Sequence, residues 1–136
     1  YSQQQWIRQL PSTVSIARND ISILVCHGSP ASTSEYVYPD TDIDKFLSNL
    51  PSLPHILILG HTHYPMTIRH TDCLLINPGS VGQPRNNQPG AHWALLDLDT
   101  MEVEHMIEHY DASLLCNLCH EIAPNHPYLQ TVLTRK

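Results

Sequence analysis

The amino-acid sequence predicts one layered domain of mixed α/β or α+β architecture. Two observations carry this prediction. Apolar runs of strand length alternate with segments of helical spacing in the first part of the chain, and hairpin patterns follow in the second. A length of 136 residues suits a single domain, and a hydrophobic content of 41% suits a packed interior. We therefore expect residues 1–136 to belong to one domain.

Apolar periodicity and chain-breaking residues place the elements in order. Helical spacing stops at Pro11, and the run HILILG at 55–60 is typical of a strand buried on both faces of a sheet. Two later alternating patterns turn near Asp72 and near Thr100, as hairpins do. In chain order we expect a helix at 3–10, strands at 12–17 and 21–26, a loop at 28–40, a helix from 41 or 42 to 50, a strand at 55–60, a hairpin of 66–70 with 73–78, a loop at 77–90, a hairpin of 91–99 with 101–110, a helix from 111 that breaks at 124, and a last helix at 128–133.

Charge and hydropathy argue against several functions. The formal net charge is −6 and the seven basic residues stand apart, whereas binding to a nucleic-acid backbone needs a basic stripe. Apolar runs last only about five residues, and a membrane span needs about 20. The N-terminus has no basic region followed by an apolar core, so we expect no secretory signal and a cytoplasmic protein. The chain starts at Tyr1 instead of Met, and we interpret it as a processed or excised piece.

The cysteines fall into two pairs with different expected roles. Cys26 and Cys73 lie inside apolar runs, so we expect buried thiols. Cys116 and Cys119 belong to the sequence CNLCH, which has the C-x-x-C-H form of c-type haem attachment. Haem attachment and a redox or metal pair are alternatives there. We favour packing of an amphipathic helix into the core, because this spacing places both thiols on one helical face.

Two apolar runs each end in a histidine next to a glycine, and this is the strongest functional signal in the chain. ILVCHGSP contains His27, and LILGHTHYP contains His61 and His63. Neutral imidazole is a common ligand of Zn, Mn, Fe and Ni ions, and residues two apart at a strand end can project to one side. An isolated H-x-H is more often part of a surface loop. The second histidine–glycine pair and the turn-rich NPGSVG loop at 77–82 favour a metal site instead.

The segments VCHGSP, GHTH and NPGSVGQPR, in this order, resemble the C-terminal half of calcineurin-like metallophosphoesterases, and in particular the small bacterial and archaeal phosphodiesterases. The resemblance extends from about residue 10 to residue 111. It implies a four-layer αββα sandwich with a dinuclear metal centre at the strand ends, of which this chain would be the C-terminal half. By this resemblance His27 and His61 bind the second metal, and His63 binds the first.

The same resemblance implies two divalent metal ions, with Mn²⁺ expected and Fe, Ni, Co or Zn as alternatives. It places the loop at 77–85 beside the active site, which makes Arg85 a candidate substrate contact. The family motifs D-x-H, G-D and G-N-H-D/E supply the bridging aspartate, an asparagine ligand and the histidine that protonates the leaving group. None of these motifs occurs in this sequence. We therefore expect a chain that lacks its N-terminal half, and we assign no catalytic residue to it.

The implied activity is metal-assisted hydrolysis of phosphodiester or phosphomonoester bonds, with a cyclic nucleotide, a nucleic-acid end or a small phosphoester as the substrate. A non-catalytic interaction scaffold of the same fold is the alternative, because some relatives keep the sheets and lose the ligands. An H-x-H amidohydrolase would need a barrel of about 250 residues, which this length excludes. Because half a sandwich exposes sheet surface, we expect a homo-oligomer or pairing with the missing half, and no membrane partner.

The remaining polar residues are expected to be structural. Tyr36 and Tyr38 are expected to cap an edge of the core, with a border of the substrate pocket as the alternative. Asp97 and Asp99 are expected to stabilise a turn. If one of the other histidines has a functional role, we expect it to be His92, because it follows the NPGSVG loop. The histidines expected to be structural or to lie at the surface are His55, His70, His92, His105, His109, His120 and His126.

Overall fold

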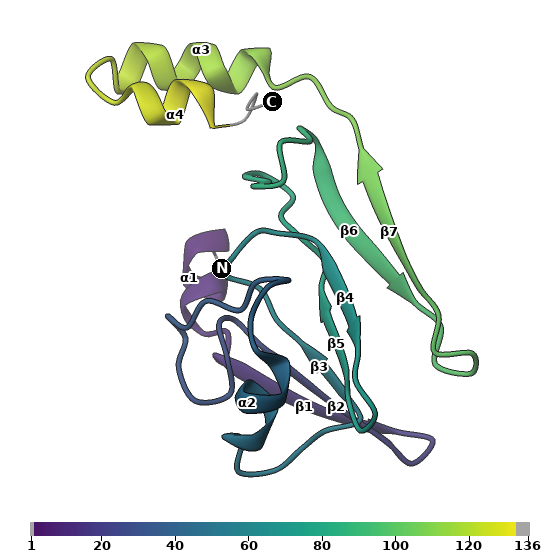
Figure 1. The fold of residues 1–136 in the computed structure, drawn as a ribbon. Helices are drawn as coiled ribbons and strands as arrows, with labels where there is room; N and C mark the ends of the chain where they lie inside the picture. The colour runs from purple at the N-terminus through teal and green to yellow at the C-terminus, as the bar shows by residue number, and fades with distance from the viewer. Residues whose placement is uncertain (1, 133–136) are drawn as a thin grey trace.

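The computed structural model describes residues 2–132 and places them in two sheets and four helices (Figure 1). Five strands form the larger sheet in the order β1-β2-β3-β5-β4, and β6 and β7 form a separate hairpin. The elements are α1 (Gln3–Arg8), β1 (Thr13–Arg18), β2 (Ile21–Cys26), α2 (Ile43–Ser48), β3 (Ile56–Ile58), β4 (Met66–Arg69), β5 (Leu74–Asn77), β6 (Ala91–Leu96), β7 (Val103–Glu108), α3 (Ser113–Ile122) and α4 (Pro127–Thr131). Each expected helix and strand is present; the strand expected at 21–26 has these same bounds, and the other elements have shifted ends.

The larger sheet is parallel at its centre and antiparallel at both edges. β2, β3 and β5 run parallel, whereas β1 and β4 pair antiparallel with their neighbours. The register aligns Leu24, Leu57 and Leu75 across the three parallel strands. Leu57 and Leu75 are 0% exposed, because both faces of their strands are covered. The apolar run at 55–60 is thereby explained, and its prediction as a buried strand is confirmed.

Alternating side chains of β3 and β5 belong to two core clusters on opposite faces of the sheet. Leu57, Leu75 and Phe46 of α2 belong to the first cluster. The second cluster packs against apolar residues of the β6–β7 hairpin and of its turn. Its members are Ile23, Ile56, Leu74 and Ile76, with Leu96, Leu98, Met101 and Val103 packed against them. Helix, sheet and hairpin thus form successive layers, which confirms the mixed α/β fold class.

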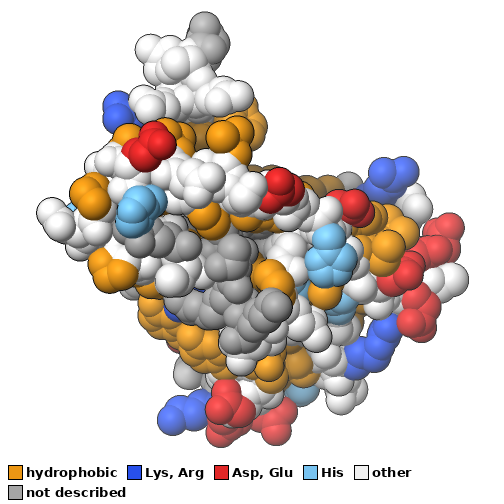
Figure 2. Space-filling model, turned by 90° about the horizontal axis from the view of Figure 1, so that it is seen from above, with side chains coloured by type: hydrophobic (Ala, Val, Ile, Leu, Met, Phe, Trp, Pro, Cys, Tyr) orange, Lys and Arg blue, Asp and Glu red, His pale blue; other side chains and the backbone are white. Residues whose placement is uncertain are grey.

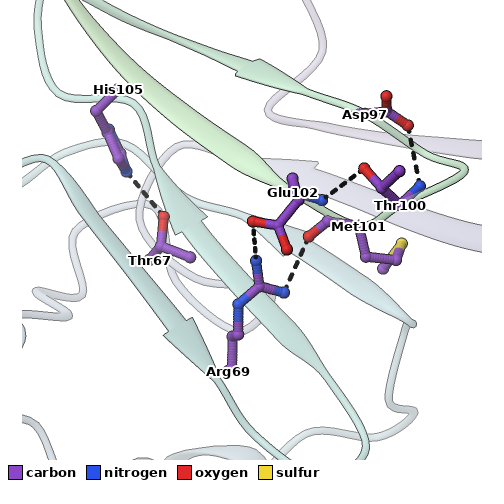
Figure 3. A network of polar contacts seen from close by, with 7 residues as sticks. All are labelled: Thr67, Arg69, Asp97, Thr100, Met101, Glu102 and His105. Atoms are coloured by element: carbon purple, nitrogen blue, oxygen red, sulfur yellow. Dashed lines mark hydrogen bonds and ion pairs between the residues drawn. The ribbon is translucent and has the colours of Figure 1, made fainter.

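Polar contacts also fasten the β6–β7 hairpin to the edge strand β4 (Figure 3). Thr67 Oγ1 lies 2.8 Å from His105 Nε2. Arg69 donates from Nη1 to the carbonyl oxygen of Met101 at 2.9 Å, and its Nη2 lies 3.3 Å from a carboxylate oxygen of Glu102. These contacts are exposed to solvent, where such pairs contribute little. The apolar cluster beneath them therefore carries most of the attachment.

Helices α3 and α4 pack on each other and lie above the rest of the chain in the view of Figure 1. The helix expected after residue 111 forms, but its expected packing into the core is wrong, because no residue of α3 is buried. Leu114 is 81% exposed and Ile122 is 73% exposed. Figure 2 shows hydrophobic side chains open at the surface on this side of the molecule. Helical periodicity identified the helix, but it does not say which surface the apolar face will meet. The expected end of α4 at 133 lies outside the described residues.

The buried thiols are where the sequence predicts them. Cys26 is 6% exposed and Cys73 is 3% exposed, and burial raises the pKa of each thiol to about 11. Cys116 and Cys119 are free, half-buried thiols on α3. Over residues 2–132, no helix is both long enough and apolar enough to cross a lipid bilayer.

Candidate metal centre

Three polar loops meet where the parallel strands of the larger sheet end. His27 directly follows β2, His61 and His63 follow β3, and Asn77 is the last residue of β5. Because β2, β3 and β5 are parallel neighbours, their carboxyl ends lie along one edge of the sheet. Ligand sites of α/β sheets form at this kind of edge. The topology therefore brings together the three histidines that the sequence pattern singled out.

A buried hydrogen-bond network holds the loop ends in place. Asn77 donates from Nδ2 to the carbonyl oxygen of Gly60 at 2.9 Å and to Thr62 Oγ1 at 2.8 Å. The Gly60 N–H donates to the carbonyl oxygen of His27 at 2.8 Å. Asn77 and Thr62 are both 0% exposed. Asn77 thus ties the end of β5 to the turn after β3, a role that its place in a turn-rich loop did not reveal.

The turn that carries His61 and His63 has an unusual backbone. Both residues adopt left-handed conformations, with φ of 60° at His61 and 56° at His63. Such a conformation costs a non-glycine residue about 1 kcal/mol or more. Strain of this kind is stored at functional sites when the surrounding structure enforces it. The buried bonds of Thr62, which lies between the two histidines, supply that constraint.

His27 and His61 present nitrogen atoms to each other. His27 Nε2 lies 2.9 Å from His61 Nδ1, and the two rings meet edge to face with centroids 4.8 Å apart. Two imidazole nitrogens that bind the same ion at about 2.1 Å each must lie within roughly 4 Å of each other. The observed separation fits that requirement. His61 Nε2 is buried and has no hydrogen-bond partner among the described residues, so this ring has a further nitrogen that lacks a partner.

His63 is held in a form suited to metal binding. Its Nδ1 lies 3.0 Å from the carbonyl oxygen of Gln83, which can only accept, so Nδ1 carries the proton and Nε2 keeps its lone pair. Burial is the main cause that lowers the pKa of His63. The neighbouring charges of Arg85, His27 and His61 lower it further, and the bond to Gln83 opposes them. The neutral imidazole that binds metals is therefore favoured at neutral pH.

The three histidines do not by themselves enclose an ion. Within residues 2–132, no group of three His, Cys, Asp or Glu side chains is arranged to hold a metal. The described residues thus provide a contacting pair, His27 and His61, and a separate third imidazole, His63. Nitrogen donors of this number fit part of a metal site, and oxygen ligands would have to complete it.

Tyr36 lies against this pair, and its loop is tightly built. Its ring centroid is 4.3 Å from that of His61. Buried Ser29 bonds to the carboxylate of Glu35, directly before Tyr36. A Cβ on Gly28 would come within 2.6 Å of a backbone oxygen, so only glycine fits at that position. The alternative in which the Tyr36 and Tyr38 loop borders the site, rather than only capping the core, is therefore favoured by the geometry.

Arg85 lies beside His63. The Arg85 N–H donates to the carbonyl oxygen of His63 at 3.1 Å. A pocket of about 580 Å³ opens at this point, and Arg85 and Tyr64 are among the residues that line it. The loop at 77–85 thus runs next to the histidines, as the resemblance implies.

His92 and Asp97, two other polar residues that the sequence singled out, have structural roles in this fold. His92 is 4% exposed, and its Nε2 donates to the carbonyl oxygen of Gln88 at 2.8 Å. It fixes the loop before β6, and a Cβ on Gly79 would come within 2.8 Å of it. Asp97 accepts from the N–H groups of Asp99 and Thr100, which confirms its turn role and lowers the pKa of its carboxyl group.

Comparison with known proteins identifies the family of this chain. The sequence profile described as the calcineurin-like phosphoesterase superfamily domain matches residues 1–101. This chain belongs to that superfamily, which consists of metal-dependent phosphoesterases, and the resemblance seen in the sequence is confirmed.

Named relatives are longer than this chain. Phosphodiesterase YfcE of Escherichia coli is 39% identical over 57 residues, which cover 40% of this chain and 30% of YfcE. Probable metallophosphoesterase MJ0623 of Methanocaldococcus jannaschii is 40% identical over 77 residues, 56% of this chain and 37% of that protein. A metallophosphoesterase crystal structure from Sphaerobacter thermophilus superposes with a TM-score of 0.77 at 27% identity, over 96% of this chain and 61% of that one. The chain thus matches about a third of the length of the two curated relatives.

Proposed function

We propose that this chain contributes His27, His61 and His63 to a dinuclear metal centre that hydrolyses phosphoesters. The observation that carries the proposal is the contact of His27 Nε2 with His61 Nδ1 at 2.9 Å, next to a buried nitrogen of His61 that lacks a partner. In a protein of this superfamily, the pair would hold one ion and His63 would hold the other.

The roles of the protein groups follow from their contacts. Divalent ions bound there would supply a hydroxide nucleophile at neutral pH and neutralise charge on the phosphate oxygens. The Gln83 carbonyl keeps His63 in the tautomer whose Nε2 is free. Asn77 and Thr62 hold the turn between the two ligands rigid. The guanidinium of Arg85, next to His63, would attract and orient a phosphate oxygen.

We also propose that the oxygen ligands come from a segment outside these 136 residues. Two facts support this: the described residues hold no three-ligand group, and the matched relatives are longer. The DNA that precedes the Tyr1 codon would then encode D-x-H, G-D and G-N-H-D/E in one reading frame. An upstream frame without these motifs would instead favour a scaffold that has lost catalysis.

Activity is tested on the whole protein with bis(p-nitrophenyl) phosphate and Mn²⁺. We expect His61→Ala to lower kcat at least about 100-fold, the scale on which loss of a metal site or a key stabilising group acts. His120→Ala, on exposed α3, is the matched control and should retain wild-type activity. Wild-type turnover in the His61→Ala variant would refute the assignment of this ligand. No turnover by the wild type with Mn²⁺, Zn²⁺, Ni²⁺, Co²⁺ or Fe²⁺ would refute the proposed function.

A further inference from the structure

The pocket beside the histidines is lined by aromatic and charged side chains, and hydrolysis of a phosphoester does not by itself require the aromatic ones. It has a volume of about 580 Å³, within the range of pockets that hold small organic ligands. Its walls come from three segments that are far apart in the sequence: the loop after β2, the loop after β3 and the loop after β5. The lining residues are Tyr38, Pro39, Asp40, Tyr64 and Arg85. A bare phosphate would leave the aromatic part of this lining unused.

One wall of the pocket is continuous with His63. Tyr64 is the next residue in the chain and is half-buried. Arg85 is joined to His63 by its N–H bond to the His63 carbonyl oxygen at 3.1 Å, and its charge acts on the His63 ring. A phosphate held at His63 would therefore lie close to a cation and to an aromatic ring at once.

A second part of the lining, Tyr38, is connected to His61 through Tyr36. Tyr38 stacks on Tyr36, with centroids 5.9 Å apart and ring planes 10° apart. Tyr36 in turn lies 4.3 Å from the His61 ring, centroid to centroid. Tyr36 and Tyr38 thus form a row of aromatic rings between His61 and the pocket.

The polar ends of the lining residues are available. Among the described residues, the guanidinium of Arg85 and the carboxylate of Asp40 make no hydrogen bond or ion pair, and neither do the hydroxyls of Tyr38 and Tyr64. Two tyrosine faces suit a planar ring, because stacking on aromatic side chains tolerates any ring with a π-face. The free carboxylate and hydroxyls suit the amino and hydroxyl groups of a nucleoside.

We propose that this pocket binds the planar ring of a nucleoside or aryl phosphoester, stacked on Tyr38 or Tyr64, while the phosphate lies toward His63 and Arg85. This inference rests on the proposed function, because it assigns the leaving group of the same reaction. It narrows the substrate class to phosphoesters with an aromatic group and disfavours sugar phosphates without one.

The test compares phosphate monoesters that have an aromatic ring with one that has none. Isothermal titration in EDTA measures binding of adenosine 5′-monophosphate, ribose 5-phosphate and phenyl phosphate to the chain. We expect the nucleotide to bind about tenfold more tightly than ribose 5-phosphate, which is the usual effect of stacking one base. Tyr38→Leu and Tyr64→Leu keep bulk in the pocket, and at least one of them should reduce that ratio to near one. Trp93→Ala, an exposed aromatic of the hairpin, is the matched control and should leave the ratio unchanged.

The outcomes separate the two proposals. Tight binding of phenyl phosphate would identify a general aryl site, whereas preference for the nucleotide would identify a nucleoside site, and both support the ring pocket. Equal binding of the nucleotide and ribose 5-phosphate, or a ratio that survives both leucine variants, would overturn it. Because these titrations contain no metal, a protein that selects the nucleotide yet shows no metal-dependent turnover would contradict the proposed function and leave the ring pocket standing.

Discussion

The strand-rich body of the molecule and its C-terminal helices contain similar side chains but bury them very differently. Leu57 and Leu75, at the centre of the larger sheet, are 0% exposed, whereas Leu114 on α3 is 81% exposed. In the body, α2 and the β6–β7 hairpin cover opposite faces of one sheet. In the C-terminal region, α3 packs on α4 and buries none of its residues. The two regions have similar side chains. They differ in whether another layer of the structure packs on each helix or strand.

The candidate metal ligands all lie in the strand-rich body. His61 and His63 follow β3, whose residues Ile56 and Leu57 are 0% exposed, and His27 follows the neighbouring strand β2. Asn77 bonds to Gly60 and Thr62 in the turn that carries His61 and His63. A rigid sheet edge can hold ligand atoms within the narrow limits that a metal requires, which a half-exposed helix pair cannot do as well. The region with the buried sheet is therefore also the region that contains the candidate ligands.

The largest difference in stability between the two regions is expected when a leucine side chain is truncated in each. Leu57→Ala should lower the free energy of unfolding by about 2–5 kcal/mol, because it leaves a cavity between covered faces. Leu118→Ala on α3, where leucine is 46% exposed, should change it by no more than about 0.5 kcal/mol. Urea denaturation followed by circular dichroism measures both. Equal losses in the two variants would show that α3 has a burial partner in solution.

Alkaline pH should destabilise the body through its buried thiols. Folding raises the pKa of Cys26 and Cys73 from 9.0 to about 11, so between these values the unfolded chain loses protons that the folded chain keeps. The unfolded state then binds fewer protons, and stability falls as pH rises from 9 to about 11. The loss is on the order of 2 kcal/mol per thiol. Urea denaturation at pH 8 and at pH 11 measures it. A Cys73→Ala variant should show a smaller pH dependence, and an unchanged one would rule this thiol out as a cause.

Asn77→Ala should have an intermediate effect. It leaves Thr62 Oγ1 and the Gly60 carbonyl without their buried donor, which costs about 1–3 kcal/mol. Asn117→Ala on exposed α3 is the control and should be near neutral. Thermal unfolding of the two variants gives the comparison. A similar melting temperature for both would mean that the network does not hold the turn.

The smallest effect is expected at the surface of the hairpin. Arg69→Ala removes an ion pair with Glu102 whose side chains are 52% and 77% exposed, and should cost less than about 1 kcal/mol. The loss should shrink in 1 M salt, which screens exposed charges. A large, salt-independent loss would show that the arginine stem packs on the hairpin instead. Denaturation at low and high salt distinguishes these results.

Much of the fold could be predicted because its signals are local. Pro11 ends α1, the apolar run at 55–60 contains β3, and alternating residues mark both later hairpins. The histidine positions could be predicted as well, because a strand followed by His and Gly is visible in the sequence. Family membership then followed from three short motifs and is confirmed by the profile match.

What the sequence missed depends on contacts between distant residues. Asn77 bonds to Thr62 across the sheet edge, and Tyr36 meets His61 from another loop. His92 could be flagged by position, but only the fold shows that it is buried as a loop support. The apolar face of α3 was expected in the core because its spacing is helical, and spacing does not identify a partner surface. Local sequence patterns thus predict the elements and the candidate ligands, whereas the residues that support the candidate site can be identified only from the topology.

The most direct measurement is an NMR titration of the imidazole signals with substoichiometric Mn²⁺. A paramagnetic ion broadens the signals of nearby nuclei, so the account predicts early loss of the His27, His61 and His63 signals. The signals of His120 and His126, on or next to the C-terminal helices, should persist. The His61→Ala variant should then retain the His27 signal. Uniform broadening of all histidines, or first loss at the C-terminal helices, would contradict the assignment of the metal centre to the strand ends.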